Sequence, residues 1–338
     1  MRLVLDAMGS DTCPEPEIDA SIEAVKIFHD EIKLVGPEDI LKQRFTEKGG
    51  LIQGIEIVHA PETITMEDKG LQLALKVKRK GSSTSMAVGI DMVKRGEADA
   101  FITAGNTGGA MATAYFRLGT IPGVELPALT ALFPVKEGFC VVLDIGANPE
   151  CKPENLVQFA IMGSIYANKV RGIPKPRVGL LSNGEEAGKG NHLVKATFPL
   201  LENSGINFIG NVEGKELFGG SADVVVTDGF TGNILLKSSE AVGKLIVDVM
   251  TQQLKSNLVS KVGAFLARPK LRKVKEIINP DEIGAAPLLG VDGLVFIGHG
   301  RSNSHALVSA IRTARTSVEA NLLTEIRQTI QERLSIQK

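Results

Sequence analysis

The chain has 338 residues and a formal net charge of −1, so it has no general attraction to nucleic acid or to an acidic surface. Hydrophobic residues make up 43% of it, enough for a real core. Trp is absent and Tyr is scarce, which argues against base-stacking platforms, so we expect no nucleic-acid partner.

The three cysteines, Cys13, Cys140 and Cys151, have no metal or redox spacing and are expected to be reduced thiols of a cytosolic protein. Met1-Arg2 runs directly into a predicted strand, so we expect no signal peptide. No apolar run approaches the ~20 residues of a spanning helix. We therefore expect a cytoplasmic protein.

Six short apolar runs each stop at a glycine beside an uncharged polar or acidic residue. They lie in 3–10, 101–108, 141–148, 178–184, 224–229 and 295–300. Continuous apolar runs of this length predict strands buried on both faces, as in a parallel sheet covered by helices. Ligands of such sheets bind outside the carboxyl ends of the strands. We therefore expect these loops to lie at one shared sheet edge and to form an active site there.

Segments with helical periodicity alternate with these strands. They are Pro16 to Asp30, Ser82 to Lys94, Thr107 to Leu118, Pro153 to Val170, and Asn191 to Asn203. Alternating strands and helices predict a layered α/β fold with right-handed crossovers.

The alternation of predicted strands and helices ends after Thr231. Residues from Ile234 to about Ile278 predict two helices, with the break at Gly263 and Pro269. One strand, Leu294 to Ile297, and a helix from about Asn303 to Leu334 follow. We expect a main α/β/α region at 1–233, a helical hairpin at 234–280, and a return to the core at 281–338.

The second half of the predicted hairpin is basic. Between Val249 and Lys275 there is no acidic residue, and the cations are Lys255, Lys261, Arg268, Lys270, Arg272, Lys273 and Lys275. Apolar Val262, Phe265 and Leu266 are expected at the turn. One interpretation is a solvated basic face. The other is a protruding hairpin that touches an anionic bilayer reversibly, with Phe265 and Leu266 as the membrane contacts.

Missing motifs narrow the chemistry. The first strand is followed by Ala7-Met8-Gly9-Ser10-Asp11, which is not a dinucleotide-binding turn. The stretch 184–190 is one residue short of a P-loop and has no Ser or Thr after Lys189. There is no nucleophile elbow, and the five histidines form no zinc-type cluster. Hydride transfer, ATP chemistry, Ser-triad hydrolysis and zinc catalysis are all disfavoured, and we expect no metal or cofactor.

Glycine and amide loops remain as candidate sites. The turn Gly105-Asn106-Thr107-Gly108-Gly109 would direct backbone N–H groups at an anion, or it is only a tight turn with an Asn cap. We favour the anion site, because similar loops recur after the other predicted strands. Lys189 lies between two glycines and is either a mobile charge for phosphate or an ordinary loop lysine.

The turn Gly229-Phe230-Thr231-Gly232-Asn233 opens a helix. Asn233 can donate to a developing oxyanion, or its side chain can be satisfied locally. Asp6, Asp144 and Asp228 each end a strand and can either orient a donor or cap and brace a loop. For Asp144 we favour bracing.

Two further segments remain. Gly298 to Ser304 precedes the last helix and can cradle an anion, with His299 as a proton carrier or as a buried, satisfied side chain. The stretch from Lys69 to Arg95 is basic, either a solvated face or a surface for an acidic partner; against Asp91 it carries Lys76, Lys78, Arg79, Lys80, Lys94 and Arg95.

Several of these motifs together resemble the bacterial phosphate acyltransferases of the PlsX type, over nearly the whole length. The stretches that carry the resemblance are 6–9, 104–108, 144–148, Lys152 to Gly163, 225–233 and 286–290. The chain departs from the family pattern at Ser10, Thr12, Leu126 and Arg301, where the family usually has glycine, histidine, arginine and serine.

The resemblance implies reversible transfer of a fatty acyl group from acyl carrier protein to inorganic phosphate. The acyl phosphate would feed the first acylation of glycerol 3-phosphate in phospholipid synthesis, with a glycerol-3-phosphate acyltransferase as a candidate partner. It also implies a three-layer α/β/α fold similar to phosphotransacetylases and isopropylmalate-type dehydrogenases, a homodimer, and a paired helical hairpin that meets the inner face of the plasma membrane.

The resemblance makes Lys189 and Asn233 the expected catalytic residues, and Asp228 would brace the Asn233 turn. Phosphate and substrate contacts are expected from Asp6, Gly9, Gly105, Asn106, Thr107, Asn148, Gly229, Thr231, His299 and Ser302. Two alternatives remain open: a phosphotransacetylase-like enzyme that uses acyl-CoA, and a non-catalytic, membrane-recruited scaffold on the same fold.

Overall fold

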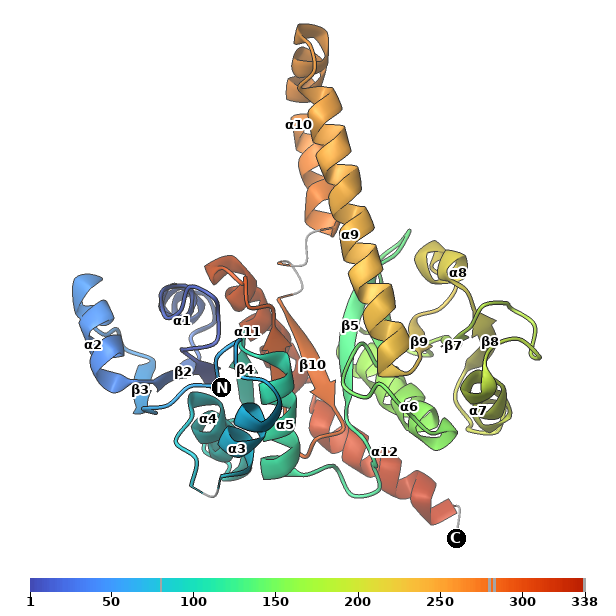
Figure 1. Cartoon of the computed structure of the whole chain (residues 1–338), viewed down its shortest axis with the longest axis horizontal. Helices are drawn as coiled ribbons and strands as arrows, with labels where there is room; N and C mark the ends of the chain where they lie inside the picture. Colours follow the sequence, from blue (N-terminus) through green and yellow to red (C-terminus); the bar gives the residue numbers. More distant parts are fainter. Residues whose placement is uncertain (80, 279–280, 282–283, 337–338) are drawn as a thin grey trace.

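The computed structural model describes residues 1–79, 81–278, 281 and 284–336. Its centre is one sheet of eleven strands (Figure 1). In spatial order these are β3 (Ile55–His59), β2 (Glu31–Gly36), β1 (Arg2–Asp6), β4 (Ala100–Thr103), β11 (Val295–Gly298), β10 (Ala285–Leu289), β5 (Ala128–Pro134), β6 (Phe139–Leu143), β9 (Val224–Val226), β7 (Val178–Leu181) and β8 (Phe208–Val212).

The sheet is largely parallel, but it contains two sets of strands that run in opposite directions. Strands β3, β2, β1, β4 and β11 are mutually parallel, and so are β6, β9, β7 and β8. Between the sets, the pairs β11–β10, β10–β5 and β5–β6 are all antiparallel. Three reversals leave the two sets antiparallel, so their carboxyl ends do not share one edge. The prediction of a single shared edge is therefore wrong.

Helices cover both faces of the sheet. They are α1 (Glu15–Phe28), α2 (Glu38–Glu47), α3 (Gly70–Lys78), α4 (Ser85–Lys94), α5 (Thr107–Leu118), α6 (Pro153–Lys169), α7 (His192–Glu202), α8 (Gly214–Gly219), α9 (Gly229–Leu254), α10 (Leu258–Ile278), α11 (Ser304–Glu319) and α12 (Leu322–Ile336).

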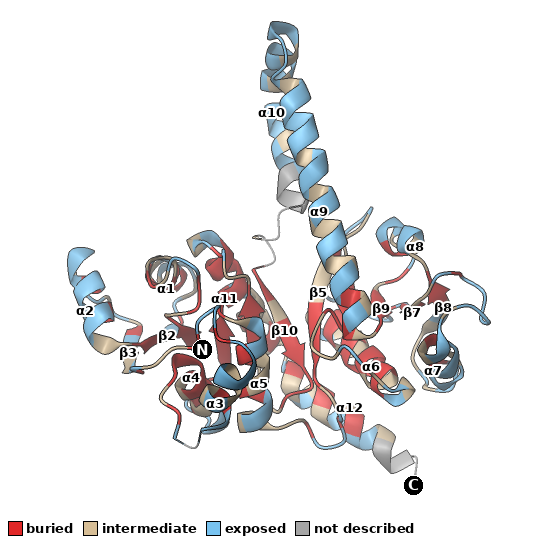
Figure 2. Cartoon of the chain, viewed as in Figure 1, coloured by how far each residue is buried: buried red, intermediate tan, exposed pale blue. Residues whose placement is uncertain are grey.

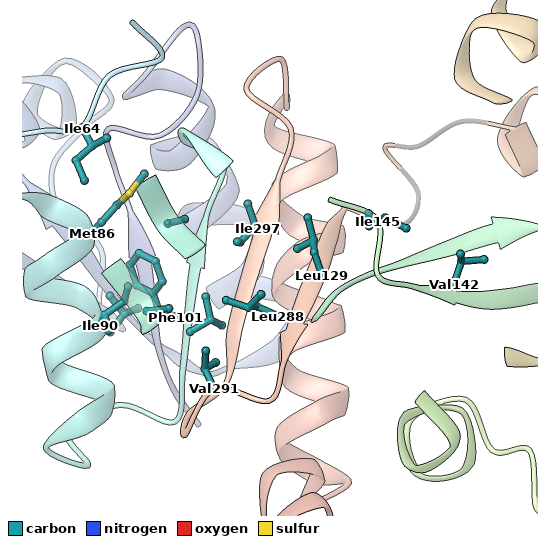
Figure 3. Packing of buried hydrophobic residues seen from close by; sticks show 14 of the residues in the cluster. Ile64, Met86, Ile90, Phe101, Leu129, Val142, Ile145, Leu288, Val291 and Ile297 are labelled. Atoms are coloured by element: carbon teal, nitrogen blue, oxygen red, sulfur yellow. The ribbon is translucent and has the colours of Figure 1, made fainter. Parts of the chain in front are cut away.

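Alternate residues of each strand point to opposite faces, which defines the three layers. On β1, Val4 packs in a cluster with α4 and α5, whereas Leu3 and Leu5 pack with α1, α2 and α11. On β6, Val142 joins the first of these clusters, and Val141 packs with α6 and α12. The first cluster runs across both strand sets (Figure 3). The predicted three-layer α/β/α fold is confirmed.

The five helices predicted before residue 204 are confirmed, each to within three residues, as α1, α4, α5, α6 and α7. The prediction of one strand after the hairpin is incomplete, because β10 precedes β11. Pro287 disfavours a central strand, since it has no N–H to donate. Here Pro287 nevertheless lies opposite Phe296 in the β10–β11 pair.

The C-terminal helix predicted as continuous is interrupted between α11 and α12. Asn321 adopts a left-handed conformation with φ 51° at this point. A left-handed residue cannot continue a right-handed helix, and Asn tolerates this conformation better than most residues.

Helices α9 and α10 form a hairpin that projects from the body (Figure 1). Its break lies at 255–257, not at Gly263 and Pro269, which both lie inside α10. Val262, Phe265 and Leu266 accordingly lie in the first turns of α10 rather than in the connection. The hairpin is mostly exposed (Figure 2), and a Cβ on Gly263 would meet nothing within 4 Å.

The expected segment boundary after residue 233 falls inside α9, which begins at Gly229. The expected boundary at 280/281 lies beside residues outside the described part of the chain. No helix within the described residues is both long and apolar enough to cross a membrane.

Candidate functional site

A buried carboxylate organises the loop that follows β6. Asp144 is 0% exposed, and its Oδ1 accepts hydrogen bonds from the backbone N–H groups of Leu129, Gly146 and Ala147 at 3.1, 3.0 and 2.9 Å. Its Oδ2 accepts from the backbone N and the side-chain Nδ2 of Asn148 at 2.7 and 2.8 Å. Burial raises the pKa of Asp144, and these donors oppose that shift. The favoured bracing role of Asp144 is confirmed.

The first turn of α9 packs directly on this loop. Gly229 donates its N–H to the carbonyl of Asn148 at 2.8 Å. A Cβ on Gly229 would lie 2.6 Å from that oxygen, and a Cβ on Gly232 would lie 1.9 Å from the carbonyl oxygen of Asp144. Both contacts are impossible for a larger residue, so the two glycines are needed for backbone-to-backbone contact.

Asp228 is the N-cap of α9, and both of its carboxylate oxygens accept hydrogen bonds from Thr231. Oδ1 accepts from the Thr231 N–H and Oδ2 from its hydroxyl, each at 2.8 Å. Such a cap satisfies one of the unpaired N–H groups of the first helical turn. Asp228 and Thr231 therefore hold the turn, with one hydrogen bond from Thr231 on each carboxylate oxygen.

Asn233 lies exposed on the turn that these contacts fix. The position of a Cβ on Gly146 is 3.7 Å from the Cβ of Asn233, so the Asp144 loop passes directly beside this side chain. Within the described residues, the Asn233 amide makes no side-chain hydrogen bond. It is a free donor on a rigid support, which is the arrangement needed to stabilise an oxyanion.

Lys189 lies exposed in the loop after β7, and the backbone of this loop is held from several sides. Lys189 donates its N–H to Glu186 O at 2.9 Å, and Asn211 donates to the same oxygen at 2.8 Å. A Cβ on Gly184 would lie 2.6 Å from the Lys189 Cγ, so the aliphatic stem packs on that glycine. In the part of the chain described, its ammonium has no carboxylate partner.

The β7 loop and the Asn233 turn follow neighbouring strands, since β7 pairs with β9. No hydrogen bond or ion pair joins Lys189 to Asn233 directly among the described residues. The structure thus places the two expected catalytic side chains at the ends of adjacent strands, both exposed and unpaired.

A second group of predicted residues follows β1 and β4. Asp6 is 1% exposed and accepts from the Thr103 hydroxyl at 2.8 Å and from the Met8 N–H at 3.1 Å. Burial raises its pKa. Thr103 in turn accepts from the Gly105 N–H at 3.0 Å, and a Cβ on Gly9 would lie 2.9 Å from that nitrogen. Asp6 and Gly9 therefore shape the turn from inside.

The Asn106 side chain is fully used in holding its own turn. Its Oδ1 accepts from the Gly109 N–H at 2.9 Å, and its Nδ2 donates to Thr65 O and Asp68 O at 3.0 and 3.1 Å. The capping interpretation therefore describes this side chain. Thr107 lies exposed in the first turn of α5.

His299 lies at an open depression of about 320 Å³ lined by Asp11, Met66, Lys237, Glu240, His299, Gly300 and Arg301. Its Nε2 is 3.4 Å from Glu240 Oε1. Burial lowers the pKa of His299, and the Glu240 charge opposes this. Ser302 is buried and donates its N–H to His299 O at 2.9 Å, which fixes the loop.

Helix α9 brings the two groups together. Asn233, Lys237 and Glu240 are spaced by four and three residues, so they share one face of the helix. Lys237 lies about 6 Å along the axis from Asn233. The free amide and the depression at His299 therefore lie side by side, although the strands before them run in opposite directions.

Sequence reasoning missed Lys237 and Glu240, because this part of α9 was assigned to the hairpin.

Sequence reasoning also missed Glu17, which is 0% exposed on α1 and accepts a hydrogen bond from the Ser10 N–H at 2.9 Å. Glu17 Oε2 and Ser10 Oγ are buried without a hydrogen-bond partner. Burial raises the pKa of Glu17 to about 7. Acidic residues are common in the first turn of a helix, so the sequence alone does not indicate that Glu17 is buried.

The described residues contain no group of three or more His, Cys, Asp or Glu side chains placed to hold a metal ion. The arrangement offers instead a free amide, a free ammonium and anchored loops.

Glu17 predicts a pH-dependent stability. Because its folded pKa is raised, the folded state binds the proton more tightly, so stability is greatest below about pH 4.5 and falls as the pH rises to about 7. Glu17→Gln removes this loss. The unfolding free energy of the variant, relative to wild type, should increase by about 2–3 kcal/mol between about pH 5 and 8, measured by urea denaturation. The exposed Glu23→Gln is the control, and parallel pH profiles for Glu17→Gln and wild type would contradict the assignment.

The chain resembles the EutD phosphotransacetylase from Staphylococcus aureus with a TM-score of 0.60 at 16% identity, covering 95% of this chain and 94% of that one. It resembles a branched-chain phosphotransacylase from Enterococcus faecalis V583 with a TM-score of 0.56 at 13% identity, covering 94% and 100%. At these identities the likeness concerns the fold, and it confirms the expected similarity to phosphotransacetylases.

Sequence relatives are much closer. The phosphate acyltransferase of Elusimicrobium minutum (strain Pei191) is 46% identical over 333 residues, covering 98% of this chain and 96% of that protein. The phosphate acyltransferase of Acidobacterium capsulatum is 47% identical over 313 residues, covering 92% of each. A family described as "Fatty acid synthesis protein" matches residues 1–325. These matches show that the chain belongs to the phosphate acyltransferase family of the PlsX type and is an acyltransferase enzyme.

Proposed function

We propose that this acyltransferase moves a fatty acyl group reversibly from acyl-[acyl carrier protein] to inorganic phosphate. The acyl phosphate would be used to make phosphatidic acid in phospholipid synthesis. The observation that carries the proposal is the free Asn233 amide, held beside Gly146 on a turn that Asp228 caps through Thr231. Such a site suits attack by an anion on a neutral carbonyl.

The reaction needs no metal or redox group. A phosphate oxygen attacks the thioester carbonyl carbon and forms a C–O bond, while the carbonyl oxygen becomes an oxyanion. Collapse of this intermediate breaks the C–S bond and releases the carrier thiolate, which takes up a proton. The products are acyl phosphate and the free carrier thiol.

Asn233 is assigned to the oxyanion. Its Nδ2 would donate most strongly when charge develops on the carbonyl oxygen, and one such donor typically lowers the barrier by about 3 kcal/mol. Lys189 is assigned to phosphate, since an unpaired ammonium lowers the cost of holding a dianion beside the thioester. Positioning both reactants supplies a further contribution, up to ~7–11 kcal/mol in ideal cases.

The remaining predicted residues support these two. Asp228, Gly229, Thr231 and Asn148 hold the Asn233 turn through backbone and capping contacts. The turn that begins at Asn106, together with exposed Thr107, offers backbone N–H groups near the depression for a phosphate or substrate oxygen. His299 lines the depression, and burial lowers its pKa, which favours the neutral imidazole. Ser302 holds the His299 loop through its backbone N–H.

The first experiment compares two acyl donors with inorganic phosphate: palmitoyl-acyl carrier protein and palmitoyl-CoA. We expect palmitoyl phosphate from the carrier-protein donor, with little from CoA. Product from CoA at an equal or greater kcat/KM would favour the phosphotransacetylase-like alternative. No product from either donor, with correctly folded protein, would contradict the proposed function.

Two substitutions test the assigned roles. Asn233→Ala should lower kcat by about 10²–10³, because one oxyanion donor is lost. Lys189→Ala should lose most of its turnover and raise the KM for phosphate, with the fold intact by circular dichroism. Lys195→Ala is the control, since Lys195 is also an exposed lysine but lies on α7. Wild-type turnover in Lys189→Ala would remove that residue from the mechanism.

The hairpin is proposed to serve both dimerisation and membrane contact. On α9, an unpartnered stripe of Val242, Leu245, Ile246 and Val249 is 47–60% exposed and repeats at helical spacing, as expected for contact with a second hairpin. Near the tip, Phe265 and Leu266 are 73% and 74% exposed. Lys261 and Arg268 flank them, and these cations would meet anionic lipid headgroups.

Membrane contact would place a cytoplasmic enzyme at the inner face of the plasma membrane. Its amphiphilic product would then be released near a glycerol-3-phosphate acyltransferase. This proposal assigns the membrane step to the hairpin at 234–280 and the chemistry to the α/β/α body.

Phe265→Asp tests the membrane contact. Replacing an exposed aromatic ring by a carboxylate removes apolar area and adds repulsion from anionic lipid, so sedimentation with phosphatidylglycerol-containing vesicles should fall several-fold. Leu200→Asp, an exposed position on α7, is the control. Equal vesicle binding by Phe265→Asp and the control would exclude Phe265 as a membrane contact.

A further inference from the structure

An exposed apolar surface on α3 and α5 is not used by the proposed reaction. On α3, Leu71 and Leu75 are 76% and 64% exposed and lie one helical turn apart. On α5, Tyr115 and Phe116 are 42% and 53% exposed, and their rings pack edge to face at 5.5 Å. The two helices pack together (Figure 1). We call these four residues with Lys78 the α3–α5 face; contiguous exposed apolar surface of this kind marks an interaction site.

The charge around this face is positive. Lys76 and Arg79 are paired with Asp68 and Glu62, so their charges are balanced locally. Lys69 and Lys78 are exposed and have no carboxylate partner within the described residues. The Lys78 ammonium lies 5.0 Å from the Phe116 ring centroid, which places a cation over the apolar centre.

Acidic residues are few around this face. One exposed acid, Glu67, precedes α3, and the sequence 69–95 contains a single acid, Asp91. Asp91 is paired with Arg117. Lys80 lies outside the described residues.

The α3–α5 face is physically tied to the candidate site. The loop before α3 accepts two hydrogen bonds from Asn106 Nδ2, through Thr65 O and Asp68 O. Met66 of the same loop lines the depression with His299 and Lys237. A macromolecule bound at this face would therefore stand next to the depression at His299, which Lys237 and Glu240 of α9 also line.

We propose that the α3–α5 face docks an acidic protein, which under the proposed function is the protein that carries the acyl thioester. Charge complementarity favours an anionic partner, with apolar side chains that fit against Leu71 and Leu75. A second copy of the chain is disfavoured, because a two-fold contact through this face would bring the unbalanced cations Lys69 and Lys78 of both copies into one interface. The inference rests on the proposed function only for the partner's identity.

The test compares Leu75→Asp and Lys78→Glu with matched controls at remote exposed positions. Ile27→Asp changes an exposed residue in the last turn of α1, and Lys175→Glu reverses the charge of an exposed loop lysine. Binding of acyl carrier protein is measured by fluorescence anisotropy, and turnover of the palmitoyl-loaded carrier is measured separately. Both docking variants should weaken binding and raise the carrier KM about tenfold, with kcat changed less than about twofold. Added salt should weaken wild-type binding more than Lys78→Glu binding.

The outcomes separate docking from chemistry. Carrier binding by Leu75→Asp and Lys78→Glu equal to that of the controls would overturn the docking proposal, even if wild-type turnover is normal. A lower kcat with unchanged carrier affinity would also overturn it, since the substitutions would then act on the site. A changed oligomeric state or a loss of vesicle binding, with carrier affinity retained, would assign the face to a second copy or to lipid. Absence of wild-type turnover would contradict the proposed function, while the binding comparison would still decide docking.

Discussion

The buried carboxylate of Asp144 is the interaction on which the site depends. A charge with no exposure is costly unless hydrogen bonds replace its water, and five donors from Leu129, Gly146, Ala147 and Asn148 do so here. Four of those donors are backbone N–H groups, so the carboxylate fixes the path of the chain. The loop can then receive the α9 backbone at Gly229 and Gly232, where there is no room for a Cβ.

The position of α9 follows from that contact, and several features share this helix. Its first turn carries Asn233, the next turns present Lys237 and Glu240 to the depression at His299, and its distal half becomes the hairpin. The antiparallel pairings at β10 and β5 separate the two strand sets. A single helix that crosses between them is therefore what allows loops after β6 and after β11 to face one site.

The sequence allowed prediction of the features with short-range causes. Continuous apolar runs identified β1, β4 and β6, because strands buried on both faces need apolar side chains at every position. Strand direction depends on pairing between distant segments, and Pro287 concealed β10, so the single shared edge was predicted wrongly. Lys189 and Asn233 are exposed, which agrees with their positions in glycine-containing turns of the sequence. The burial of Glu17 was not predictable, because it results from the Ser10 loop folding over α1.

The distribution of charge explains why this site suits an anionic nucleophile. Under the proposed function, exposed carboxylates beside the thioester would repel a phosphate dianion. The loops nearest Asn233 contain both Asp144 and Asp228. Asp144 is enclosed by its donors, and each oxygen of Asp228 is occupied by Thr231. Both acids thus stabilise their loops through hydrogen bonds within the chain. The groups left exposed and unpaired on the turn and on the neighbouring β7 loop are an amide at Asn233 and an ammonium at Lys189. Under the proposed function, the amide receives the oxyanion and the ammonium attracts the phosphate.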